Sequence, residues 1–497
     1  MPFALAPRSR APLFEQIYEH VRRRILAGDL APGAALPGSR RMASDLGVSR
    51  TTVLQAIETL RAEGYVVAHA RSGVRVARAR PDAQPIAAAR ADAGARPPRP
   101  PRLTAFARDS LALRGGASRL GAAPRAFRPG VPALDLFPIA AWTRYVARSH
   151  ARARAATLEA ADPAGHRGLR EAIARDVASA RGVRASADQV FVTNGMAHAI
   201  EEALRIAVAP GERVWIEDPT YLGTRRAVAA AGARAVPVPV DDAGLDVAAG
   251  IARAGDARAA IVTPSHHYPL GVTTDLARRI ALLAWARRAR ALIVEDDYDS
   301  EFRHRGRPVM SLAGLDDAGC VVYAGTFSKT MYPGLRIGFA IVPARYVDAY
   351  AAARAAAGNP ASILEQDALA AFIGDGQFAR HVRRMRVAYR ERAEAFADAL
   401  RAECAPALDL GRCDTGMQVC ARLARGLAVG EGALRDAAAA RGVELGALAD
   451  YYLGRPRMRG AVFGFGCARP AALRAGCREL ALALGAAVGQ GSAAPVP

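Results

Sequence analysis

Seven short runs rich in β-branched and aromatic residues recur along the chain from about residue 189, and Ala-rich helical stretches separate most of them. In chain order they are QVFVTNG, RVWIEDP, RAVPVPV, AAIVTPSH, ALIVEDDY, CVVYAGT and RIGFAIV. Because parallel strands are joined by helical crossovers, this alternation predicts an α/β fold with a mainly parallel seven-stranded sheet, covered on both faces. The last two runs lie too close together for a crossover helix, so we expect one of them to be antiparallel.

The first part of the chain, residues 10–78, has a different pattern. Its first apolar residues recur at helical spacing: Leu13, Ile17, Val21 and Ile25. The stretches GSRRMASDLGV and SRTTVLQAIETLRAEG predict two more helices, with Ser49 as the N-cap of the second. YVVAHARSGVRVA predicts two short strands around a glycine turn. Three helices and a hairpin predict a winged helix-turn-helix domain.

Such a domain places the N-terminal side chains of its second helix on base edges in the major groove. Arg50 can form a bidentate pair with guanine, and Arg40 is placed to hold the DNA backbone. The predicted DNA contacts are Arg40, Ser49, Arg50, Thr51, Thr52, Arg71 and Arg75. On pattern alone the alternative is a packing or dimerisation domain, because small three-helix bundles are common.

Two further segments have little periodicity. Residues 79–124 contain PDAQPIAAARADAGARPPRPPRL, whose composition predicts a linker that is partly extended around its prolines. The α/β pattern then fills residues 125–487. The last residues, 488–497, predict a disordered tail.

Charge and cysteine usage narrow the class of protein. The formal net charge of +21 suits a polyanionic partner, nucleic acid first, although a generally basic surface gives the same balance. None of the six cysteines forms a Cys-x-x-Cys pair, so we expect neither a metal site nor a disulfide scaffold. The N-terminus lacks the apolar core of a secretory signal, and no apolar run is long enough to span a bilayer. We therefore expect a cytoplasmic protein with no membrane partner.

Lys329 is the only lysine among 497 residues, and the remaining 67 basic residues are arginine. Arginine is tolerated wherever only charge is needed, whereas a lysine amine forms a Schiff base with an aldehyde. Lys329 also follows the run CVVYAGT, at the end of a strand where α/β sheets bind ligands. This position predicts covalent imine chemistry, and the alternative is chance survival of a surface lysine.

Other strand-end side chains suit a pyridine-containing cofactor. A carboxylate keeps such a ring protonated and makes it an electron sink, and Asp296 follows a predicted strand. Tyr298 can bond a ring hydroxyl, and Tyr221 can stack on the ring. A cofactor phosphate needs hydroxyls, backbone N–H groups and a cation. These groups are offered by Thr326, Ser328, Arg336 and the glycine turn in TNGMAHAI.

Residues of about 125–485 resemble the fold-type I aminotransferases that bind pyridoxal 5′-phosphate (PLP). The motifs that carry the resemblance are FRPGVPALDLFP, EDPTY, TPSHHYPLG, VEDDYDSEF and GTFSKTMYPGLRIG. LPGSRRMASDLGVSRTTVLQAIETLRAEGYV resembles the GntR-type winged helix. Together the two parts resemble the MocR/GabR-type transcriptional regulators.

The resemblance implies a role for each matching residue. Lys329 would hold PLP as a Schiff base, Asp296 would face the pyridine nitrogen and Tyr298 the ring oxygen. Tyr221 matches the aromatic residue that stacks on the ring. The phosphate would be held by Thr326, Arg336 and the backbone of Met196 and Ala197. The ring edge would be lined by His267 and Tyr268.

Two positions depart from the family pattern. Met196 and Ala197 replace the polar residues of the usual phosphate loop, so fewer side-chain bonds are available. Cys467 stands where aminotransferases and related regulators have an arginine for the ligand carboxylate, and Arg469 lies two residues later. An amino-acid carboxylate ligand is therefore an open question, and so is the role of Arg469.

We expect a PLP-binding transcriptional regulator whose hold on a double-stranded DNA operator is changed by a small amine, an amino acid or PLP. The resemblance also implies a homodimer in which the winged helix of one chain packs over the large domain of the other. Two alternatives stay open: an active aminotransferase that carries a DNA-binding domain, and a DNA-binding protein with an aminotransferase-like scaffold. Lys329, Asp296 and Tyr298 argue against the scaffold, and Cys467 favours sensing over turnover.

Overall fold

The computed structural model describes residue 5 and residues 11–69, 73–78, 102–112, 125–155, 157, 162–304, 310–358, 362–411 and 413–491. The chain forms two compact units, residues 1–101 and residues 102–497. Among the described residues, none of the helices combines the length and the apolar character that crossing a bilayer requires.

The described part of the first unit contains three helices around one apolar core. They are α1 (Leu13–Ala27), α2 (Ser39–Leu46) and α3 (Arg50–Ala62). The core packs the predicted stripe of α1 against residues of α3: Ile17, Val21, Ile25, Val53, Ile57 and Leu60. Helices α1 and α2 each end at a glycine in the left-handed conformation, Gly28 with φ 87° and Gly47 with φ 67°, which glycine adopts at little cost.

A hairpin completes this unit. Strands β1 (Val66–His69) and β2 (Gly73–Val76) pair antiparallel, with Val66 opposite Val76. Both of these valines are buried in the core formed by the helices. The prediction of a winged helix-turn-helix is confirmed.

The second unit is built on an eight-stranded sheet with the order β3-β10-β9-β8-β7-β4-β5-β6. Its strands are β3 (Val190–Thr193), β4 (Arg213–Asp218), β5 (Arg234–Asp241), β6 (Gly244–Leu245), β7 (Ala259–Val262), β8 (Leu292–Asp297), β9 (Val321–Thr326) and β10 (Gly338–Ile341). All seven predicted runs form strands, and β10 is antiparallel to both neighbours, as expected for one of the last two runs. The predicted number of strands was one too low, because β6 is a two-residue return of β5 that has no pattern of its own.

Helices cover both faces of this sheet. One face carries α8 (Met196–Ala207), α9 (Leu222–Ala230) and α14 (Val347–Ala357). The other carries α7 (Arg167–Arg181), α10 (Val247–Ala254), α11 (Leu276–Ala289), α12 (Leu312–Leu315) and α15 (Ile363–Gly374). Successive side chains of a strand point to opposite faces, so Val294 packs on the α8 side and Ile293 on the other. By the same alternation Asp296 lies on the α8 face and Asp297 on the opposite one.

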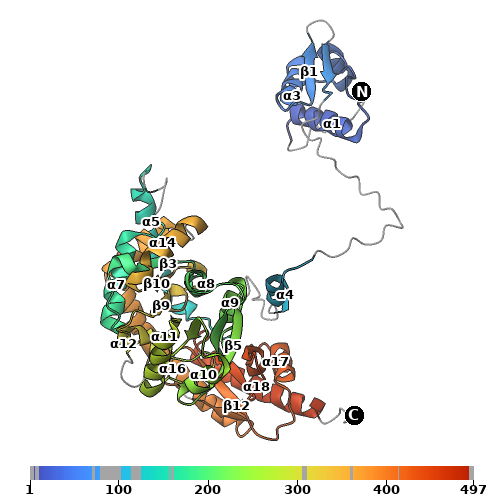
Figure 1. Cartoon of the computed structure of the whole chain (residues 1–497). Coiled ribbons are helices and arrows are strands. Elements are labelled where there is room, and N and C mark those ends of the chain that lie inside the picture. Colours follow the sequence, from blue (N-terminus) through green and yellow to red (C-terminus); the bar gives the residue numbers. More distant parts are fainter. Residues whose placement is uncertain are drawn as a thin grey trace. The chain divides into compact units, whose positions relative to one another are not determined.

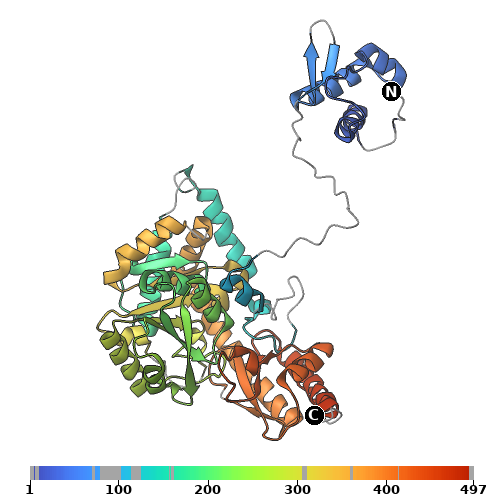
Figure 2. The same cartoon turned by 45° about the vertical axis from the view of Figure 1, so that its right-hand side comes forward.

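A smaller antiparallel sheet follows, with the order β11-β12-β14-β13, and lies beside the large sheet in orange and red (Figures 1 and 2). Its strands are β11 (Leu408–Leu410), β12 (Gln418–Leu423), β13 (Gly446–Ala447) and β14 (Gly460–Gly464). The helices of this part and of its approach are α5 (Ile139–Arg152), α16 (Gln377–Cys404), α17 (Glu431–Ala440) and α18 (Pro470–Gly491).

Helices lie within two segments that were predicted to be irregular. Helix α4 (Ala105–Ala112) falls inside the predicted linker, residues 79–124, and packs against α9. Helix α18 continues to Gly491, four residues into the predicted tail, residues 488–497. Helix α4 is rich in alanine, whose high helix propensity outweighs the low complexity of that stretch, whereas residues 488–491, VGQG, simply continue the end of the 22-residue helix α18. Residues 79–101, 113–124 and 492–497 lie outside the described ranges.

Candidate functional site

The start of α3 presents polar side chains at the surface of the first unit. Ser49 caps the helix, since its Oγ accepts a hydrogen bond from the Thr52 backbone N–H at 3.1 Å and lies 2.8 Å from the Thr52 hydroxyl. Arg50 and Thr51 are exposed beside this cap. The Arg50 Nε donates to the Ser39 hydroxyl at 3.3 Å, which ties the guanidinium to the start of α2.

The other predicted DNA contacts differ in their surroundings. Arg40 is exposed on α2. Arg75 is only half-exposed, and its guanidinium donates to the Gly33 carbonyl oxygen at 2.9 Å, so part of its hydrogen-bonding capacity holds the wing to the preceding loop. Arg71 lies outside the described residues.

In the second unit, β9 delivers Lys329 to the edge of the large sheet. The strand ends at Thr326, and Lys329 lies in the single turn of α13 (Phe327–Thr330). Its Nζ donates a hydrogen bond to the Gly130 carbonyl oxygen at 2.7 Å. Burial lowers the pKa of Lys329, while the negative charges of Asp299 and Asp296 act in the opposite direction. A lowered pKa raises the share of the neutral, nucleophilic amine.

The neighbouring strand β8 delivers Asp296. This carboxyl is 4% exposed, and its Oδ1 atom is buried with no hydrogen-bond partner among the described residues. Burial raises the pKa of Asp296 well above its ordinary value, and the charges of Asp297, Glu217 and Asp299 raise it further. Because buried polar atoms are nearly always paired, this oxygen is a site for a donor that the protein does not itself supply.

Tyr298 lies at the centre of a buried polar network. Its hydroxyl is 3.1 Å from Nδ1 of His266 and accepts a hydrogen bond from the Gln418 amide at 3.4 Å. The same Nδ1 of His266 lies 2.9 and 3.0 Å from the two carboxylate oxygens of Asp299. Gly416 packs on this pair so closely that a Cβ there would lie 2.4 Å from the His266 ring. The sequence pointed to Tyr298 but gave no signal for His266, Asp299 or Gln418.

Backbone N–H groups and one arginine form the end of the site predicted for a phosphate. Helix α8 starts after Gly195, which has φ 84°, so its first N–H groups are available as in other anion-binding helix starts. Arg336 lies against this turn, since its guanidinium donates to the Asn194 carbonyl oxygen at 2.9 Å. Met196 contributes only backbone, because its side chain is buried in the core, whereas Ala197 is exposed.

The predicted hydroxyls of this region are placed less favourably. The Thr326 hydroxyl oxygen accepts a hydrogen bond from the Ser328 backbone N–H at 3.2 Å and so caps α13. Ser328 itself is half-buried.

Arg336 has φ 54°, in the left-handed region that is strained for a residue other than glycine, as is common where function fixes a side chain.

Tyr221, predicted to stack on the ring, and His267 and Tyr268, predicted to line its edge, take different roles. Tyr221 is 44% exposed, and its ring meets Tyr268 edge to face with 5.6 Å between the ring centroids. The Tyr268 hydroxyl donates to Tyr451 at 3.2 Å. Nε2 of His267 donates a hydrogen bond to the Pro219 carbonyl oxygen, and Nδ1 accepts one from the backbone N–H of Leu270. The His267 ring therefore links two loops.

Arg469 is engaged elsewhere. Its Nε donates to Asp135 at 3.2 Å, and the side chain is 78% exposed. The buried Arg392 binds the same carboxylate at 2.9 Å. Cys467, at the position of the expected arginine, directs its thiol to the carbonyl oxygens of Arg125 and Gly464.

Each of the two parts of the chain matches a known protein family. Residues 132–440 match the family "Aminotransferase class I and II", and residues 13–76 match "Bacterial regulatory proteins, gntR family". The kynurenine aminotransferase of Pyrococcus horikoshii has a TM-score of 0.67 at 23% identity, over 78% of this chain and 95% of that one, which shows a common fold.

Two curated relatives match nearly end to end. The probable rhizopine catabolism regulatory protein MocR of Rhizobium meliloti is 39% identical over 478 residues, which cover 94% of this chain and 93% of that protein. The pyridoxine biosynthesis transcriptional regulator PdxR of Corynebacterium glutamicum is 31% identical, and the match covers 94% of each chain. The chain therefore belongs to the MocR-type family of transcriptional regulators, which join a GntR-type DNA-binding domain to an aminotransferase-class domain.

Proposed function

We propose that this MocR-type regulator binds PLP covalently through Lys329, and that a small amine, an amino acid or PLP itself changes its hold on a DNA operator. The observation that carries the proposal is the buried Oδ1 of Asp296, which has no partner among the described residues and lies within electrostatic reach of the only lysine. When bound, PLP supplies an aldehyde and an electron-withdrawing ring. Its protonated ring nitrogen is the kind of donor that the Asp296 oxygen lacks.

The network around Tyr298 fixes the direction of its hydroxyl proton. Nδ1 of His266 lies between two carboxylate oxygens of Asp299, so it carries a proton and acts as a donor. The Gln418 amide is a donor as well. Since a protonated Nδ1 has no lone pair left, it cannot accept the Tyr298 hydroxyl proton, and that proton is left for another acceptor. A negatively charged ring oxygen of PLP is such an acceptor, which supports the role proposed for Tyr298.

The phosphate of PLP suits the start of α8. The N–H groups after Gly195 and the guanidinium of Arg336 supply donors and positive charge at one point. Thr326 and Ser328 add polar groups beside Lys329, and Tyr221 covers the ring from the N-terminus of α9. His267 and Tyr268 complete the wall, the first by holding the loop backbone and the second by packing on Tyr221.

The operator is proposed to be read by residues 10–78 and the signal to be received by residues 125–487. Arg50 would contact a base, Arg40 a phosphate, and the hydroxyls of Ser49, Thr51 and Thr52 the same groove. The wing would contribute Arg71 and Arg75. A homodimer, in which the winged helix of each chain packs on the large domain of the other, would present two readers to a two-fold operator.

The part of the site where a ligand carboxylate would bind favours sensing over turnover. Turnover requires a substrate clamped in one geometry while a proton moves at its reacting carbon. Arg469 is exposed and bound to Asp135, and Cys467 faces backbone carbonyls, so neither offers a firm clamp. The retained Lys329, Asp296 and Tyr298 support the alternative of an active aminotransferase. The name of the relative PdxR concerns pyridoxine biosynthesis, which supports including PLP among the candidate effectors.

The decisive experiment compares Lys329→Arg and Lys329→Ala with the parent protein. The parent protein should be yellow, and borohydride reduction should attach the cofactor at Lys329 alone, as seen by mass spectrometry. Both variants should lose the Schiff-base absorption band, although Lys329→Arg keeps the charge. An unchanged spectrum in Lys329→Arg would refute the proposal.

A second measurement separates a sensor from an enzyme. Amines and amino acids are added to the PLP-loaded protein while absorbance and operator affinity are followed together. A sensor changes both at the same ligand concentrations and forms little or no pyridoxamine phosphate. Rapid repeated conversion of an amino acid and an oxoacid, with constant operator affinity, establishes the aminotransferase instead.

A further inference from the structure

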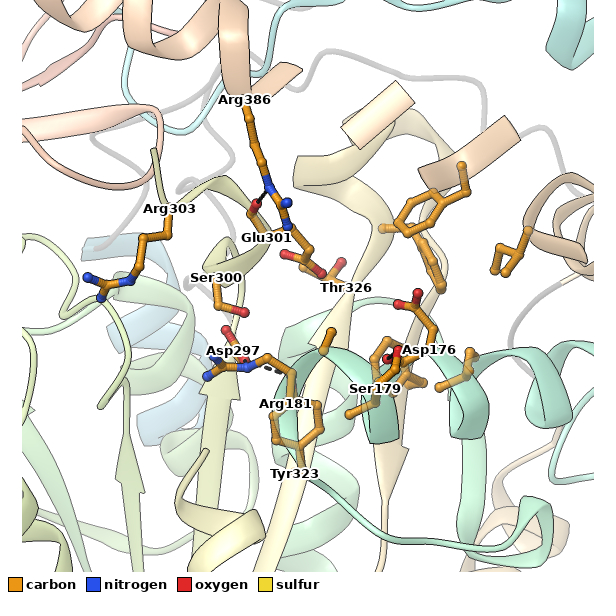
Figure 3. A pocket seen from close by; sticks show the side chains of 17 residues that line it. Asp176, Ser179, Arg181, Asp297, Ser300, Glu301, Arg303, Tyr323, Thr326 and Arg386 are labelled. Carbon is orange, nitrogen blue, oxygen red and sulfur yellow. Dashed lines mark hydrogen bonds and ion pairs between the residues drawn. The ribbon is translucent and has the colours of Figure 1, made fainter. Parts of the chain in front are cut away.

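A cavity of about 400 Å³ lies on the face of the large sheet opposite Asp296. It is enclosed by α7, the ends of β8 and β9, the short helix η4 (Ser300–Phe302) and the start of α16 (Figure 3). Asp297 and Tyr323 line it, whereas Asp296 and Ala324 belong to the α8 face. The sheet therefore lies between this cavity and the proposed PLP site, although Thr326, at the end of β9, lines the cavity and is also proposed to bind the PLP phosphate. Its volume suits a small organic molecule.

Much of the wall is apolar and aromatic. Phe327, Phe339 and Phe378 line the cavity together with Ile173, Val177 and Ile373. These residues belong to the core that covers this face of the sheet. A ligand that fills the space therefore needs an apolar, preferably aromatic, body.

The basic side chains near the cavity are committed to other groups. Arg181 donates to Asp297 at 2.7 Å, so the charges of these two side chains neutralise each other (Figure 3). The Tyr323 hydroxyl donates to the same carboxylate at 2.6 Å. Arg303 points away and donates to the Thr273 hydroxyl at 3.3 Å. Arg386 lies at the exposed rim, where its Nε donates to the Glu301 backbone oxygen.

Two carboxyl groups face the cavity, and the charge of Arg386 at the rim acts on one of them, Asp176. Oε2 of Glu301 is buried and makes no hydrogen bond in the described part of the chain, and the Glu301 and Asp176 carboxyls both point into the cavity in Figure 3. Burial raises the pKa of Glu301 to about 8 and raises that of Asp176 as well. Within the described residues no cluster of three potential metal ligands exists, so the two carboxyls do not indicate a metal ion.

We propose that this cavity is a second ligand site for a small organic cation with an aromatic body, an arylalkylammonium ion, whose ammonium group binds Glu301 and Asp176. Charge-assisted hydrogen bonds to two carboxylates would satisfy the buried Glu301 oxygen, and the three phenylalanine rings would enclose the aromatic part. Such a ligand would contact Phe327, the first residue of the helix that carries Lys329. Apart from Thr326, its lining residues lie outside the proposed PLP site, so we expect the cavity to bind its ligand without PLP.

The test uses cofactor-free Lys329→Ala protein, in which an added amine has neither PLP nor a lysine to react with. Isothermal titration with 2-phenylethylamine should show binding, whereas 3-phenylpropionate, which has a similar body and the opposite charge, should not bind. Adding Glu301→Gln or Asp176→Asn should weaken amine binding at least about tenfold, because a neutral amide cannot lose a proton to become the charged acceptor that the ammonium group needs. The control is Glu171→Gln on the same helix, where the side chain is exposed and paired with Arg167.

Circular dichroism and thermal unfolding show whether each variant keeps its fold, and either carboxyl variant alone suffices for the comparison. Affinity for the amine that is unchanged in both carboxyl variants overturns the proposal. So does equal binding of the amine and the carboxylic acid, or no binding of the amine at millimolar concentration.

Discussion

Nζ of Lys329 donates to the carbonyl oxygen of Gly130 at 2.7 Å, and Gly130 has φ 73°, a conformation that favours glycine. A Cβ at residue 130 would lie 3.0 Å from Nζ. The two residues are 199 positions apart in the chain, so this contact fixes the lysine through the N-terminal approach to the large domain. The glycine is required both by its backbone and by the space that the amine occupies.

Gly130→Ala should reduce the fraction of protein that PLP modifies. The left-handed conformation costs a residue with a Cβ about 1–2 kcal/mol, and the methyl group displaces Nζ. Mass spectrometry after borohydride reduction measures the modified fraction, and thermal unfolding measures the stability. Gly485→Ala is the control, because a Cβ there meets no atom within 4 Å. Full modification of the Gly130→Ala protein would show that the contact has no bearing on the lysine.

His266 should act on the cofactor through Tyr298. His266→Phe removes the hydrogen-bond donor of the buried Asp299 carboxylate and the nitrogen beside the Tyr298 hydroxyl, so we expect a shifted PLP absorption band and a stability loss of about 1–3 kcal/mol. His266→Asn retains a neutral donor near the position of Nδ1, so it should restore most of the original absorption band and most of the lost stability. Tyr298→Phe should reproduce the shifted band. If His266→Phe leaves the band in place, His266 serves the fold alone.

Glu217 should make the stability of the cofactor-free protein depend on pH. Its Oε2 accepts hydrogen bonds from Thr263, its Oε1 has no partner among the described residues, and burial raises its pKa to about 8. From about pH 5 to 8 the folded state keeps a proton that the unfolded chain releases, so stability falls as pH rises.

Glu217→Gln should remove this dependence. Relative to the parent protein, the variant should gain about 3 kcal/mol of unfolding free energy between about pH 5 and pH 8. Urea unfolding at several pH values measures the difference, and Glu403→Gln, on the surface, is the control. Parallel pH profiles for the parent and the Glu217→Gln protein would contradict the assignment.

Arg50 and Arg40 should differ in how they affect operator binding. Arg50→Ala should cost about 1–3 kcal/mol on the operator and relax the preference at one base position, whereas Arg40→Ala should weaken binding to every sequence. Arg40→Ala should also lower the slope of log affinity against log salt by about one unit, if it contacts one phosphate. Arg61, paired with Glu58 in the last turn of α3, is the control. Loss of affinity for all sequences alike in Arg50→Ala would remove it from base recognition.

Much of the fold could be predicted because its strands are buried on both faces and stand out as apolar runs. Lys329 and Asp296 could be found since each follows such a run, and the ends of neighbouring parallel strands meet at one edge. β6 could not be found, because two residues carry no periodicity. The helices α4 and α18 extended into segments whose composition alone suggested irregular structure.

The orientation of adjacent residues was harder to predict. His266 and His267 are neighbours, and the resemblance pointed to His267 as a residue of the ring edge. In the structure His267 binds the Pro219 carbonyl oxygen, 48 residues away, and this contact turns His266 towards Tyr298. Loop paths of this kind depend on distant contacts that no local pattern records. The same reason hides the buried carboxyl of Glu301, whose surroundings come from α7, β8, β9 and α16.

The solitary lysine also gives the molecule a built-in spectroscopic probe. Growth on isotope-labelled lysine places the label in one residue of a 52.2 kDa chain, with one amide nitrogen and one side-chain nitrogen. The nuclear magnetic resonance signal of that side-chain nitrogen belongs to the amine held at Gly130 and needs no assignment. Its chemical shift reports directly whether the nitrogen is an amine, an ammonium ion or an imine. An arginine-rich composition that removed every other lysine thus leaves the chemistry of a large protein readable at a single atom.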